Sequence, residues 1–231
     1  MRKFLLFTLL GGLPFCAFSQ HYFHTGFWTR VALNAKLTPK LNLMGEVGMR
    51  RQNNLHHLSP IENPQTSNVK FTLTYQFKHL NVILSPYENI YSYQLLGKDA
   101  DLSVPRLHEL RFSGGLEYVK AWTKSRLQFR NVYEYRKFDA ITRYRNRTRL
   151  LSRFTLSSKT LMTLYDEVFI NLPPNRLPNA FNQNRLSCTF THSITPHFDV
   201  EAGYVYVLAE RFTLSEYDHT NGLILYLMFK L

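Results

Sequence analysis

The chain has 231 residues, with 28 lysines and arginines against 16 aspartates and glutamates, and a formal net charge of +12 at pH 7. Hydrophobic residues make up 45% of it, yet after residue 20 no apolar run reaches the about 20 residues that a membrane-spanning helix needs. The composition therefore excludes a helical membrane protein. A basic chain could bind nucleic acid, but the export signal at its start argues against that partner.

The start of the chain has the features of a secretory signal peptide. A basic beginning is followed by the apolar run 4–13, and Ala17 and Ser19 supply the small residues that precede a cleavage site. We therefore predict a cleaved signal peptide over residues 1–19 and one domain over residues 20–231.

Cysteine usage fits an exported chain without disulfides. A lipoprotein signal is the rival interpretation because Cys16 is present, but Phe15 stands where such signals require a small residue. Cleavage after residue 19 removes Cys16 and leaves Cys188 alone, so no disulfide within the chain is expected.

Alternation of apolar and polar residues predicts a series of β-strands along the rest of the chain. The clearest case is 69–78, where Val69, Phe71 and Leu73 alternate with lysine and threonine. A wall with lipid outside and water inside needs this pattern. It predicts strands over 26–35, 41–49, 69–78, 80–93, 109–118, 127–136, 143–156, 162–171, 183–190, 198–206 and 223–231.

Short and long connections alternate between these strands. Short turns are predicted at 38–40, 78–79, 157–159 and 195–197, and long polar loops at 51–67, 97–105, 172–180 and 211–218. Tight turns on one membrane side and loops on the other are typical of outer-membrane barrels. We therefore predict an all-β fold, a single antiparallel transmembrane β-barrel with short periplasmic turns and longer extracellular loops, in the bacterial outer membrane.

The number of strands is the open point of this prediction. The pattern gives an odd number, whereas single-chain bacterial barrels normally have an even one. Either residues 20–25 supply one more strand, or the first apparent strand is not part of the wall. The range is 10–12 strands, and we favour 12.

Residues 143–156 form the most distinctive strand. Its arginines fall on odd positions, while Leu150, Phe154 and Leu156 fall on even ones, so one face is basic and the other apolar. If all polar rows face inward, the lumen contains a network of charges formed by Glu46, Arg50, Glu109, Arg111, Glu117, Arg130, Glu134, Arg136, Arg143, Arg145, Arg147, Arg149, Arg153, Glu167, Arg185 and Glu201.

Three functions are compatible with this predicted lining of the lumen. Arginine and glutamate can join opposite walls and block the bore, which predicts a structural barrel or a narrow channel. The excess of arginine alternatively predicts an anion-preferring pore for small solutes. A lipid-modifying enzyme would need a serine and a histidine at the outer leaflet, and neither His192 with Ser193 nor His219 fits that site. We expect no enzyme, no catalytic or metal site and no cofactor.

A set of short motifs resembles one known family. They are Trp28, Glu109-x-Arg111, 144–149, 166–171 and 181–185. In their order and spacing they are similar to an uncharacterised gram-negative outer-membrane barrel family, the domain of unknown function twenty-four ninety. The resemblance implies an outer-membrane barrel of unknown activity and transfers no catalytic residue. Expected contacts are outer-membrane lipid, lipopolysaccharide and an unknown protein at the loops, with the barrel a monomer.

Overall fold

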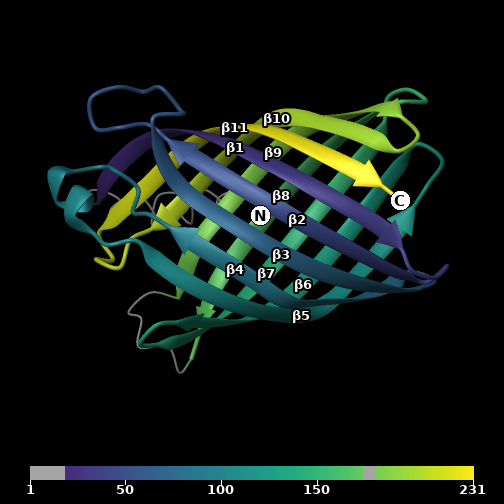
Figure 1. The fold of residues 1–231 in the computed structure, drawn as a ribbon, viewed down its shortest axis with the longest axis horizontal. Helices are drawn as coiled ribbons and strands as arrows, with labels where there is room; N and C mark the ends of the chain where they lie inside the picture. The colour runs from purple at the N-terminus through teal and green to yellow at the C-terminus, as the bar shows by residue number, and fades with distance from the viewer. Residues whose placement is uncertain (1–18, 174–179) are drawn as a thin grey trace, which may run out of the picture.

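The computed structural model describes residues 19–173 and 180–231, and these residues form one closed β-barrel of 11 strands (Figure 1). Strands that follow one another in the chain pair side by side and antiparallel. The predicted signal peptide lies outside the described residues except for Ser19. The strands are β1 Gln20–Lys36, β2 Leu41–Gln52, β3 Asn63–Phe77, β4 Leu80–Ser92, β5 Leu107–Ala121, β6 Ser125–Phe138, β7 Thr142–Thr155, β8 Thr160–Leu172, β9 Phe181–Thr195, β10 Phe198–Glu210 and β11 Glu216–Lys230.

The barrel closes through a parallel pair, β1 with β11, from Gln20 beside Glu216 to Asn34 beside Lys230. The favoured number of 12 strands is therefore wrong, and the closing pair is not antiparallel. Residues 20–25 do not form a separate strand but extend β1, because they pair with β11 before β2 begins to pair at Gly26. An odd number of strands closes a cylinder only if the first and last run in the same direction, as these do (Figure 1).

The two faces of the wall follow the alternation in the sequence. Outward residues are apolar and exposed; for example, Phe129 is 48% exposed and Leu223 is 55% exposed. Their chain neighbours Gln128 and Gly222 belong to the inward row. Polar and charged side chains of that row are mostly buried in the lumen. The predicted all-β barrel with an apolar outside is confirmed.

Connections at the two ends of the barrel differ in length. Tight turns join β1 to β2, β3 to β4, β5 to β6, β7 to β8 and β9 to β10 at one end. Longer connections lie at the other end, except for the short link between β6 and β7, and the loop from β4 to β5 contains the 3₁₀ helix η2, Asp99–Ser103. The predicted loop 51–67 is shorter than expected, since β2 and β3 extend into it. No helix among the described residues is long and apolar enough to cross a membrane.

Candidate functional site

A chain of ion pairs follows the lumen wall from β3 to β9. Consecutive charged groups are 3.3–3.8 Å apart, close enough for each carboxylate to offset the basic groups beside it. We call this chain the charge girdle. Its members are Lys70, Glu88, Arg111, Glu134, Arg147, Glu167 and Arg185.

Glu134 of β6 is the centre of the charge girdle. Its side chain is 1% exposed and forms ion pairs with Arg111, Arg147 and Arg145. The Nη2 atom of Arg145 lies 2.6 Å from the carboxylate. An unpaired buried carboxylate costs several kcal/mol, so these three guanidinium groups are what allows Glu134 to remain charged in the lumen. They also hold β5, β6 and β7 together from the inside.

Aromatic rings fill the space between the charged groups. The ring of Phe169, only 1% exposed, lies under the guanidinium groups of Arg145 and Arg185, at 4.7 and 4.5 Å from its centre. Trp28 of β1 contacts Arg185 of β9 at 5.5 Å and Arg50 of β2 at 3.9 Å, so one ring connects distant parts of the wall. At this level the side chains meet across the lumen.

Other predicted carboxylates of the lumen pair with arginines outside the charge girdle, and Glu109 is also bound by Arg111 of the girdle at 2.8 Å. Glu109 accepts two hydrogen bonds from Arg136, at 2.8 and 2.9 Å. Glu117 pairs with Arg130 at 2.7 Å, and Glu46 is 3.4 Å from Arg30.

Besides Arg50, four of the predicted residues have no ion pair within 4.0 Å among the described residues. They are Arg143, Arg149, Arg153 and Glu201. Arg143 contacts the rings of Phe138 and Phe212 instead.

Sequence reasoning missed further charged residues of the lumen, among them Arg30, Lys70, Glu88 and Arg126. Arg30 and Lys70 lie on rows that the alternation assigns to the polar side, so that pattern could have found them. Glu88 could not be found in this way, because the pairing of β4 shifts between Ser85 and Glu88. This irregularity turns Glu88 inward, where it meets Lys70 and Arg111.

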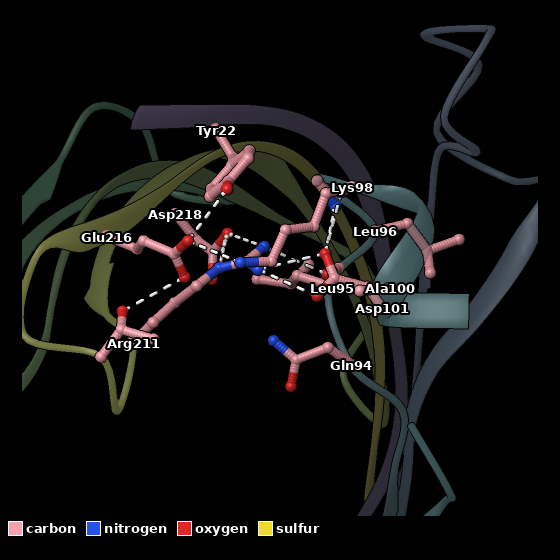
Figure 2. A network of polar contacts seen from close by, with 12 residues as sticks. Tyr22, Gln94, Leu95, Leu96, Lys98, Ala100, Asp101, Arg211, Glu216 and Asp218 are labelled. Carbon is pink, nitrogen blue, oxygen red and sulfur yellow. Dashed lines mark hydrogen bonds and ion pairs between the residues drawn. The ribbon is translucent and has the colours of Figure 1, made fainter. Parts of the chain in front are cut away.

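A second cluster lies at the loop end of the barrel and joins segments far apart in the sequence. Arg211 follows β10 and donates hydrogen bonds to Asp218 of β11 and to Asp101 of η2, at 2.7–3.1 Å (Figure 2). Lys98 of the same loop binds Glu216 at 2.5 Å. We call Lys98, Asp101, Arg211, Glu216 and Asp218 the loop clamp, since they hold the β4–β5 loop against the β10–β11 hairpin.

Two further contacts reinforce the loop clamp. The side-chain amide of Gln52 donates to Gln94 O at 2.9 Å and accepts from Leu96 N at 3.1 Å. His24 of β1 lies 2.9 Å from Asp218, so the barrel seam takes part in the same cluster. The loop is thereby bound to β1, β2 and β11.

Charges in the loop clamp support one another. The hydrogen bond from Lys98 lowers the pKa of Glu216, and in return Glu216 raises the pKa of Lys98. Burial lowers the pKa of Arg211, but Asp218 and Asp101 outweigh it and raise that pKa above its ordinary value. All three groups are therefore charged at neutral pH.

We expect acid to release this loop. Glu216 has a lowered pKa, so its link to Lys98 is present at and above pH 4.5 and is lost as the pH falls below that ordinary value. Hydrogen exchange of the Gly97 and Lys98 amides, corrected for the intrinsic rate, should stay constant down to pH 4.5 and then rise several-fold. Glu216→Gln should show the raised exchange at neutral pH already, while Glu210→Gln should not.

Exchange that is the same in Glu216→Gln and the unaltered protein at neutral pH would show that the link does not hold the loop. Glu210 is a suitable comparison because it contacts Tyr217 and not the β4–β5 loop.

His192 and Ser193 lie next to each other but have separate partners. His192 lies 3.0 Å from Thr160, while the adjacent Ser193 donates to Asp199, so the two side chains do not form a nucleophile and base. Within residues 19–173 and 180–231 no group of three or more potential ligands could hold a metal ion.

Comparisons with known proteins identify a family for the sequence but no activity. Residues 25–217 match the family described as "Protein of unknown function (DUF2490)". No curated protein matches the chain. A similar solved structure is described as "NanC porin structure in rhombohedral crystal form"; it is 9% identical, covers 79% of this chain and 85% of that chain, and has a TM-score of 0.49. This likeness says nothing about what the lumen does.

Proposed function

The chain belongs to the DUF2490 family of proteins of unknown function, and from its own geometry we propose an outer-membrane barrel whose lumen is closed at rest. Its role is then structural, or that of a narrow channel, and it needs no catalytic residue. The predicted signal peptide and the exposed apolar outer face support the outer membrane as its place. We further propose a monomer surrounded by lipid and lipopolysaccharide, with the loops free to meet a protein partner.

The observation that carries this proposal is the enclosure of Glu134. A carboxylate that lies within a barrel strand and is only 1% exposed does not line a water-filled passage. The same holds for Phe169 and Trp28, at 1% and 3% exposed. The loop clamp adds a second barrier at the loop end.

Conductance in a planar lipid bilayer tests the closed lumen. We expect the refolded protein to be electrically silent at moderate voltage, because the charge girdle and the rings within it leave no continuous water path. Insertion is checked in the same sample by protection of the strands from protease. Regular conductance steps from the unaltered protein would contradict closure.

An anion-preferring narrow channel is the second candidate. The observation that favours it is that Arg149 and Arg153 lack an ion-paired acid among the described residues, so the lumen holds uncompensated positive charge. If conductance steps appear, anion preference should fall when Arg147 and Arg149 are both replaced by glutamine. Preference that is unchanged in this variant would remove the candidate.

A further inference from the structure

The end of the lumen at the short turns contains a cluster of arginines that differs from the charge girdle. Four arginines of β6 and β7 lie in the inward rows, and the pairing register places them directly opposite one another in two like-charged pairs. Like charges opposite each other across two strands are destabilising unless something compensates them. The pairs of this arginine cluster are Arg126 with Arg153 and Arg130 with Arg149.

Compensation within the protein is incomplete. Arg130 has Glu117 at 2.7 Å, and Arg126 can donate to the amide oxygen of Gln128. In contrast, the Nε atoms of Arg149 and Arg153 are buried and have no hydrogen-bond partner among the described residues. A buried donor without an acceptor costs free energy, more so when it is charged.

The nearest acids do not supply the missing acceptors. Glu167 stands opposite Arg149 in the register of β7 and β8, but its carboxylate lies 3.5 Å from Arg147 and 3.8 Å from Arg185. Glu201 of β10 also faces the lumen, and no basic group comes within ion-pair distance of it among the described residues. Among the described residues, the Nε atoms of Arg149 and Arg153 therefore have no acceptor.

The cluster lies near the short-turn end of the lumen. Arg126 is the second residue of β6 and Arg153 lies two residues before the end of β7, so both are next to the mouth. Side-chain exposure there is higher, 24% for Arg130 against 5% for Arg145 in the charge girdle region. Beyond the cluster, toward the loop end, lie the charge girdle and the rings packed against it.

The rim around this mouth is basic. Nearly every short turn or adjoining strand end carries a lysine, whereas the one acid of the described rim, Asp199, is already bound to Lys230 at 2.6 Å. A rim of one sign raises the local concentration of oppositely charged ligands. These lysines are Lys36, Lys40, Lys78, Lys124, Lys159 and Lys230.

We propose that the arginine cluster is a binding site for a phosphate-class anion, which enters from the short-turn end. Guanidinium groups bind phosphate oxygens through pairs of parallel hydrogen bonds. Arg149 and Arg153 can form such pairs when their side chains turn their unpaired Nε atoms toward the anion. The same chemistry is presented by inorganic phosphate and by the phosphate of a lipid headgroup. This inference does not depend on whether the lumen conducts ions.

Calorimetric titration of the refolded protein in an uncharged detergent at low salt tests the site. One arm uses inorganic phosphate and the other short-chain phosphatidic acid below its micelle concentration. We expect saturable binding in at least one arm, weakened about tenfold by Arg149→Gln or Arg153→Gln and abolished by the double variant. Binding of both ligands identifies a free phosphate as sufficient, and binding of the lipid alone identifies the headgroup as the source.

Two comparisons separate a specific site from general charge attraction. Arg143→Gln removes the same charge from the same face of β7 at the opposite end of the strand and should leave binding unchanged. Arg149→Lys keeps the charge but loses the planar fork, so binding should be weaker than in the unaltered protein. The proposal is overturned if neither ligand binds saturably, or if Arg143→Gln weakens binding as much as Arg149→Gln.

Discussion

Replacing Glu134 by glutamine should lower the free energy of unfolding by about 3 to 5 kcal/mol, because it leaves buried arginines without their shared counter-charge. Arg145 at 2.6 Å loses most, and Arg111 and Arg147 lose the link that joins them in the charge girdle. Urea-induced unfolding in detergent, followed by tryptophan fluorescence, measures the change.

Glu201→Gln is the matched control for this variant. Glu201 also faces the lumen, but it has no ion pair among the described residues, so we expect a change below about 1 kcal/mol. Equal stability of the Glu134 variant and the unaltered protein would mean that the charge girdle does not hold the wall together.

Replacing Gly115 by alanine should prevent β5 and β6 from pairing as they do. A Cβ atom at this position would lie 2.1 Å from Asn131 O and 2.7 Å from Val132 Cα, both of which are backbone atoms that cannot rotate away. We expect a loss of about 1 to 3 kcal/mol or more, in line with the cost of overpacking. The fraction that refolds, seen as a shift in gel mobility without heating, is the measurement.

The adjacent glycine provides the control. At Gly114 an added Cβ atom would find its nearest neighbour at 3.7 Å, which is an ordinary contact, so Gly114→Ala should refold like the unaltered protein. Equal refolded fractions for the two alanine variants would show that β5 and β6 are not packed too closely at Gly115 to admit a Cβ atom.

The orientation of the wall residues could be predicted from the sequence because it depends on a period of two. Phe129, Leu223 and Leu225 face outward as the alternation indicates. The prediction fails where the period is interrupted: the irregularity between Ser85 and Glu88 in β4 changes which residues face inward. Pro86 lies within this irregularity, and proline within a sheet occurs at such bulges. A strict alternation applied across Pro86 assigns Glu88 to the wrong face, so one shift is enough to hide an acid of the charge girdle.

Contacts between distant segments could not be predicted from the sequence. Arg211 and Asp101 meet only because the β4–β5 loop folds across the loop end, and each stands in a polar segment that alone indicates a loop. The number of strands depended on the same kind of information. Residues 20–25 continue β1 because they pair with β11, and no local sequence pattern predicts that pairing.

The parallel seam has a consequence for protein engineering. Because β1 and β11 run in the same direction, Gln20 and Lys230 stand at opposite rims, and β11 alone, with 15 residues at about 3.3 Å each, spans about 50 Å. A peptide that joined these two positions would have to run through the lumen or along the apolar outer face, so this fold is unsuited to circular permutation. The same arrangement places a tag fused before Gln20 and a tag fused after Lys230 at opposite ends of the barrel.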